Sequence, residues 1–157
     1  MVGKLSIVIL LFLSFVFIVQ GNRNPEDLSK YYNCWINNQC LSDEEEAQKL
    51  RNCFMNLKPE ELKTSYMHVK ENYSHYKSDN VFDAINEFCH LDDTKRQKAY
   101  QKSAQGMIDI LKMVCSDSDK ASECSRVKDV FHCLFVNMNQ QIQEGKCTKD
   151  VNAKGMP

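Results

Sequence analysis

The eight cysteines of this 157-residue chain constrain its fold most, because all of them follow an apolar segment with the form of a secretion signal. Lys4 precedes a mostly apolar run over residues 5–19, and the small residues Val19 and Gly21 predict cleavage after Gly21. Such a signal exports the chain to an oxidising compartment, where thiols pair. Because eight is an even number, we predict four disulfides with no free thiol. They would join Cys34, Cys40, Cys53, Cys89, Cys115, Cys124, Cys133 and Cys147.

Three segments follow from this pattern: a signal peptide over residues 1–21, a single disulfide-rich helical domain over 22–147 and a flexible C-terminal tail over 148–157. The apolar run is shorter than the roughly 20 residues that span a membrane, so we expect a secreted, extracellular protein without a membrane anchor. Lys and Arg total 20 against 21 Asp and Glu, which provides no basic surface for nucleic acid. We expect a monomer.

Apolar residues recur at intervals of three and four along the chain, and the alternation typical of strands is nearly absent. This pattern predicts an all-α fold, a compact disulfide-stapled bundle of about six amphipathic helices. Capping residues stand where each periodic segment begins. The expected helix starts are Asn24 with Pro25, Ser42 with Glu45, Pro59, Ser78 or Asp79, Asp92 with Asp93, and Ser118. Gly145 is expected to end the last helix.

The spacing of two cysteines restricts the disulfide pairing. Cys124 and Cys133 are nine residues apart on the predicted last helix, which separates them by about 13 Å. A disulfide requires Cα atoms within about 7 Å. We therefore predict that these two cysteines belong to different bridges and join the last helix to two neighbours.

The spacing Cys115-x8-Cys124-x8-Cys133 resembles that of the last three cysteines of arthropod odorant- and pheromone-binding proteins. Size, secretion signal and six helices are also similar to that family, although its Cys-x3-Cys pair is missing here. The resemblance implies a carrier of small apolar molecules and a bond between Cys115 and Cys133. Other eight-cysteine helical proteins of invertebrate hemolymph, saliva and venom are similar in general character.

Aromatic and methionine side chains recur on the helical stripes, and such walls suit apolar ligands. The three longest predicted helices would supply the walls of a cavity: Tyr66, Val69, Tyr73, Tyr100, Met107, Leu111, Phe131 and Met138. A tyrosine hydroxyl would make the polar contact, because no charged residue lies on these stripes. The alternative is that these residues only fill the core. The protein would then be a venom, salivary or hemolymph component that binds an extracellular protein through its surface.

No set of catalytic or metal-binding residues is recognisable. The histidines form no HExxH pair, and there is no Gly-x-Ser-x-Gly turn or glycine-rich phosphate loop. We therefore expect no enzymatic activity, no metal and no cofactor. The single glycosylation sequon, Asn72-Tyr73-Ser74, makes Asn72 a candidate attachment site.

Overall fold

The computed structural model describes residues 28–147, and these form an all-α bundle, as predicted. The predicted signal, the first helix start at Asn24 and the tail 148–157 lie outside the described residues. Within that range there are six α-helices: α3 (Tyr32–Ile36), α4 (Glu44–Phe54), α5 (Pro59–Val69), α6 (Val81–Cys89), α7 (Asp93–Ser116) and α8 (Ala121–Gln143). Short 3₁₀ turns, η1 (Ser29–Tyr31) and η4 (Ser118–Lys120), precede α3 and α8. Single π-helical turns, η2 (Asn37–Leu41) and η3 (Lys70–Ser74), extend α3 and α5.

Several helix ends lie where the sequence predicts them. Pro59 is the first residue of α5. Asp92 caps α7, and its side chain accepts a hydrogen bond from the backbone N–H of Lys95 at 2.9 Å. Gly145 follows α8 with a φ of 68°, and the N–H groups of Gly145 and Lys146 donate to the last helical carbonyls. These bonds form a Schellman motif, which requires a left-handed residue at that position.

Two predicted caps are wrong by one or two residues. Asp43, not Ser42, caps α4 and accepts from the Glu46 N–H at 3.1 Å. The Ser42 hydroxyl instead donates to the Asn38 carbonyl at 2.6 Å, which helps to close η2. Asn80, rather than Ser78 or Asp79, caps α6. At the start of α8, Ser118 begins the turn η4 and the α-helix itself starts at Ala121.

The third predicted helix is shorter than its apolar stripe suggested. The α-helical part ends at Val69 and the following π-helical turn η3 ends at Ser74, and the next residue, His75, is left-handed with a φ of 50°. Tyr73 therefore lies in a wider turn, and Tyr76 lies beyond the helix. The chain turns away after η3 to reach α6.

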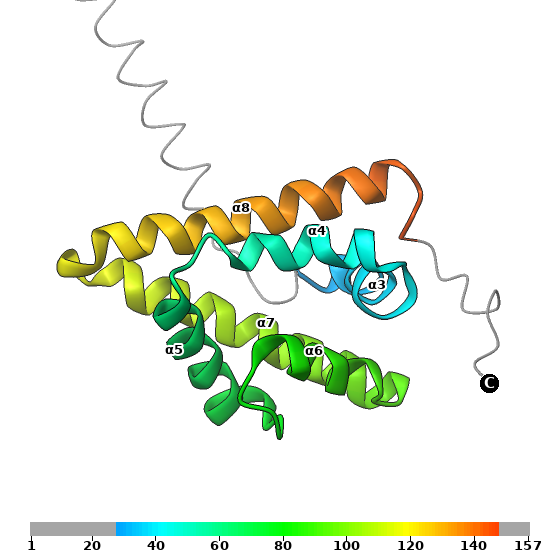
Figure 1. The fold of residues 1–157 in the computed structure, drawn as a ribbon, viewed down its shortest axis with the longest axis horizontal. Helices are drawn as coiled ribbons and strands as arrows, with labels where there is room; N and C mark the ends of the chain where they lie inside the picture. Colours follow the sequence, from blue (N-terminus) through cyan, green and yellow to red (C-terminus); the bar gives the residue numbers. More distant parts are fainter. Residues whose placement is uncertain (1–27, 148–157) are drawn as a thin grey trace, which may run out of the picture.

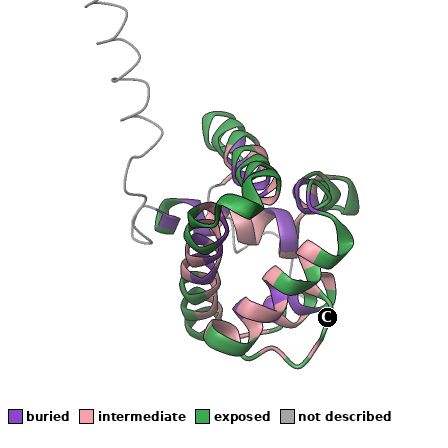
Figure 2. Ribbon diagram, turned by 90° about the vertical axis from the view of Figure 1, so that its left-hand side faces the viewer, coloured by how far each residue is buried: buried purple, intermediate pink, exposed green. Residues whose placement is uncertain are grey.

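The long helices α7 and α8 form a hairpin and diverge from their shared turn (Figure 1). Along α8 lie α4 and α3, while α5 and α6 lie against α7. Buried positions face the interior between these helices, and exposed positions lie along the outside (Figure 2). Charged groups on the inner side of α5 and α8 also join them, because the Arg126 guanidinium donates two hydrogen bonds to the Glu61 carboxylate.

All eight cysteines are paired, which confirms the prediction of four disulfides. Their partners are Cys34–Cys147, Cys40–Cys89, Cys53–Cys133 and Cys115–Cys124. Cys124 and Cys133 belong to different bridges, as the helical spacing requires. The pairing of Cys115 with Cys133 that the resemblance implied is wrong. Cys115 lies in the last turn of α7 and bonds to Cys124 across the hairpin turn, whereas Cys133 lies farther along α8 and bonds to Cys53 of α4.

Candidate functional site: an apolar cavity

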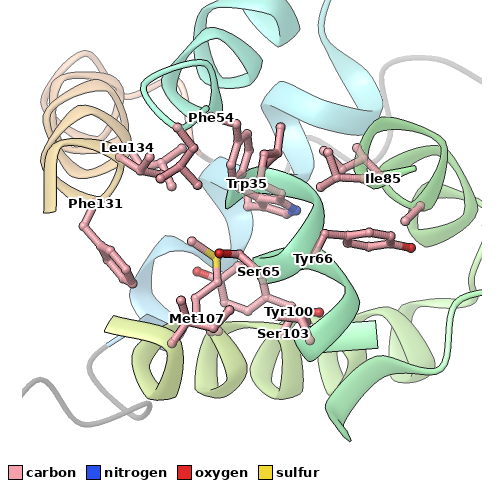
Figure 3. A pocket seen from close by; sticks show the side chains of 18 of the residues that line it. Trp35, Phe54, Ser65, Tyr66, Ile85, Tyr100, Ser103, Met107, Phe131 and Leu134 are labelled. Atoms are coloured by element: carbon pink, nitrogen blue, oxygen red, sulfur yellow. The ribbon is translucent and has the colours of Figure 1, made fainter. Parts of the chain in front are cut away.

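A cavity of about 170 Å³ lies between the helices and is lined by side chains from all six of the described α-helices. Figure 3 shows the labelled side chains approaching it from several directions, with Trp35 and Phe54 from the N-terminal half and Phe131 from α8. No lining residue is charged. The cavity is therefore an almost wholly apolar space at the centre of the fold.

Six of the eight residues predicted to bind a ligand line this cavity. They are Tyr66, Val69, Tyr100, Met107, Phe131 and Met138. These residues lie on α5, α7 and α8, the helices that the sequence prediction chose. Ligand binding by them stays a prediction.

Tyr73 and Leu111 do not line the cavity. Tyr73 lies in η3, and its ring packs directly over Gly106 of α7. Its hydroxyl donates to the Asp109 carboxylate at 2.5 Å, and this hydrogen bond lowers the pKa of Asp109 and raises that of Tyr73. Leu111 is half-buried against the rest of the core. Both side chains contribute to packing around the cavity rather than to its wall.

Sequence reasoning missed the contribution of the other three helices. Trp35 of α3, Phe54 of α4 and Ile85 of α6 all line the cavity. The apolar stripes of these helices are visible in the sequence. However, nothing in a stripe shows whether it faces filled core or open space.

Two tyrosine hydroxyls at the cavity wall already donate to the backbone. Tyr66 donates to the Ser78 carbonyl at 2.7 Å, and Tyr100 donates to the Leu28 carbonyl at 3.0 Å. Burial raises the pKa of Tyr66 to about 12 and also raises the pKa of Tyr100. The protons of these two hydroxyls are therefore already used within the protein, and a tyrosine contact to a ligand stays a prediction.

The disulfides hold several walls of the cavity at fixed positions. Cys53–Cys133 joins α4 to α8, and Cys115–Cys124 closes the turn from which α7 and α8 diverge. Cys40–Cys89 attaches the end of α6 to η2. These covalent links restrict the unfolded chain and so offset part of the free energy lost by leaving space in a core.

A second, shallow and open depression lies beside α6 and is lined by polar residues, among them Glu87. The Glu87 carboxylate accepts hydrogen bonds from the backbone N–H groups of Lys77 and Ser78 at 2.9 and 2.7 Å. Its two oxygens thus hold the turn that leads into α6, which is a structural role.

The remaining candidate groups are dispersed. Within residues 28–147, no group of His, Cys, Asp and Glu side chains could hold a metal ion. Asn72 is exposed in η3, and its amide donates to the His68 carbonyl at 2.8 Å. Carbohydrate attachment at Asn72 stays a prediction.

In the part of the chain that the structure describes, no helix is both long and apolar enough to cross a membrane. No family model, characterised protein or solved structure that we compared with the chain matches it. The fold and the site together define a disulfide-stapled all-α protein with a partly open apolar cavity between its helices.

Proposed function

We propose that the protein is a secreted carrier that holds a small apolar molecule in this cavity and has no enzymatic activity. The uncharged cavity is the observation that carries the proposal. An apolar cavity of about 150 Å³ in another protein binds benzene, so about 170 Å³ suits a ligand of similar or slightly larger size. The four disulfides and the N-terminal apolar segment support an extracellular site of action.

The energetics of the core also support a ligand. Leaving an apolar cavity of this volume empty would cost at most about 4 kcal/mol of folding stability, at about 24 cal/mol per Å³, and less to the extent that the cavity is open to solvent. Binding of an apolar molecule offsets much of this lost stability, because the ligand makes dispersion contacts with the wall and its own apolar surface is removed from water. The protein therefore gains most from a ligand that fills the space.

The test is a binding titration with the disulfide-intact protein. We expect saturable binding of the probe toluene at one site per chain, measured by isothermal titration calorimetry. The matched variants are Met107→Ala, which changes the cavity wall, and Leu111→Ala, one helical turn away on the same helix and outside the wall. Met107→Ala should change the probe affinity several-fold, whereas Leu111→Ala should leave it unchanged.

Absence of saturable binding by apolar probes of several shapes would contradict a carrier. It would favour an extracellular protein that acts by binding another protein through its surface. If both variants change the affinity equally, and in proportion to their loss of stability, the probe does not report on this cavity.

A further inference from the structure

Six of the side chains that line the cavity carry a polar atom, and four of these have partners within the protein. The hydroxyls of Tyr66 and Tyr100 donate to backbone carbonyls. The Ser103 hydroxyl lies 2.7 Å from that of Ser74, and the Tyr76 hydroxyl interacts with both. The two that remain are the indole N–H of Trp35 and the hydroxyl of Ser65.

These two groups are open to a small molecule. Among the described residues, the one fully buried side-chain nitrogen or oxygen atom without a partner is Nε of Arg96. Nε1 of Trp35 and Oγ of Ser65 have no hydrogen-bond partner within the described residues. Because neither atom is a fully buried atom without a partner, both atoms are accessible from outside the protein's own packing. In Figure 3 the Trp35 nitrogen points toward the side of the cavity where Tyr66 and Ile85 lie.

Trp35 is held firmly in this position. Its ring meets the Phe54 ring edge-on, with 6.5 Å between centroids, and lies 6.4 Å from the Tyr100 ring. The preceding residue, Cys34, is fully buried and bonded to Cys147. The indole is therefore a preorganised hydrogen-bond donor, and a donor whose position is already fixed loses little entropy when it binds.

The chemistry of the two groups differs. An indole N–H donates only, whereas a serine hydroxyl donates or accepts. Trp35 therefore requires a hydrogen-bond acceptor on the ligand, whereas Ser65 can bind either a donor or an acceptor. A pure hydrocarbon would leave the donor of Trp35 without a partner in apolar surroundings, which is unfavourable. A carboxylate would enter an uncharged wall that offers no cation to pair with it.

We infer that the cavity selects neutral, mainly apolar molecules that carry one hydrogen-bond acceptor, such as a carbonyl, ester or ether oxygen, and that the Trp35 N–H receives this acceptor. Trp35 is thus a specificity-determining residue. The inference rests on the proposed carrier function and specifies its ligand class.

The test compares acetophenone with α-methylstyrene, which have nearly the same shape but differ by a carbonyl oxygen in place of a CH2 group. Affinities for both are measured by isothermal titration calorimetry. Trp35→Phe should weaken acetophenone relative to α-methylstyrene by roughly 2- to 10-fold, the effect of one net hydrogen bond. The ratio of the two dissociation constants cancels the change in cavity volume that the substitution causes.

Tyr100→Phe is the matched control. It also removes a polar group from the cavity wall, but that hydroxyl already donates to the Leu28 carbonyl. It should lower the stability and leave the affinity ratio unchanged. If Tyr100→Phe shifts the ratio and Trp35→Phe does not, the assignment of the donor to Trp35 is wrong.

A second measurement needs no substitution, because Trp35 is the only tryptophan in the chain. Its indole N–H gives a single side-chain signal in a proton–nitrogen correlation spectrum. Acetophenone should move this proton signal downfield, as a new hydrogen bond does, and α-methylstyrene should not. This readout decides the question even if Trp35→Phe does not fold.

The outcomes separate the inference from the proposed function. Binding of both compounds, with equal indole shifts and a ratio insensitive to Trp35→Phe, would overturn the inference and keep the carrier. Binding of neither compound and of no probe would overturn both.

Discussion

Gly106 gives the sharpest test of how the helices pack, because the sequence and the structure predict opposite effects of Gly106→Ala. Gly106 lies in the middle of α7, where glycine is less stable than alanine by roughly 0.5–1 kcal/mol. Helix propensity alone would therefore make the alanine variant more stable. The structure predicts the opposite, since Gly106 is buried under η3.

The size of the effect follows from the contacts that a Cβ atom would make. It would lie 2.8 Å from Cδ2 and 3.1 Å from Cγ of Tyr73, and 3.1 Å from Cγ2 of Val69. Such overpacking costs about 1–3 kcal/mol, which exceeds the gain in helix propensity. We expect a net loss of about 1–2 kcal/mol, which lowers the melting temperature by about 3–8 °C for a domain of this size.

A double-mutant cycle isolates the cause. In a Tyr73→Ala background the closest clash is gone, so Gly106→Ala should be neutral or stabilising. In a Tyr73→Phe background the ring remains and only the hydrogen bond to Asp109 is lost, so the cost should persist. Melting is followed by circular dichroism with the disulfides intact. A rise in melting temperature for Gly106→Ala in the wild-type background would refute the packing of η3 on α7.

Two further predictions concern stability. Replacing the pair Cys34 and Cys147, which closes a loop of 113 residues, should cost about 5 kcal/mol, against about 3 kcal/mol for Cys115 and Cys124, which are 9 residues apart. Urea unfolding of the two double-alanine variants checks this order, and the reverse order would contradict the chain-entropy argument. The hydrogen bonds from Arg126 hold the pKa of Glu61 at about 2, below its usual 4.5, so the pair stabilises the fold above about pH 4.5 and this stabilisation is lost as the pH falls through about 2. Glu61→Gln should be less stable by about 1–2 kcal/mol at pH 7 and should match the wild type near pH 2, and a gap independent of pH would contradict the ion pair.

Features that depend on neighbouring residues were predictable from the sequence. Pro59, Asp92 and Gly145 mark helix ends because they act on the backbone within one helical turn. The caps at Asp43 and Asn80 were missed because several residues that can cap a helix are adjacent at each place. Which of them caps the helix depends on the direction of the incoming chain. The early end of α5 was hidden because the apolar stripe continues through η3 to Tyr76.

The disulfides show the same division. The even number of cysteines predicts that all are paired, and the rise of one helix excludes a bond between Cys124 and Cys133. Cys124 is bonded to Cys115, and Cys133 is bonded to Cys53. These partners depend on which helices lie beside α8. Only the packing of distant segments decides this.

The cavity shows which features the sequence alone does not determine. By itself the sequence determined that the protein is a disulfide-stapled bundle of amphipathic helices, and six of the eight residues that it proposed for a cavity wall do line the cavity, because core and cavity share the same apolar stripes. Tertiary structure alone decided that α7 and α8 diverge from their turn and that a space remains between them. It also decided that Tyr66 and Tyr100 donate to the backbone while Trp35 does not. The physical reason is that periodicity reports which face of a helix is buried, whereas the volume left between faces depends on the angles at which helices cross.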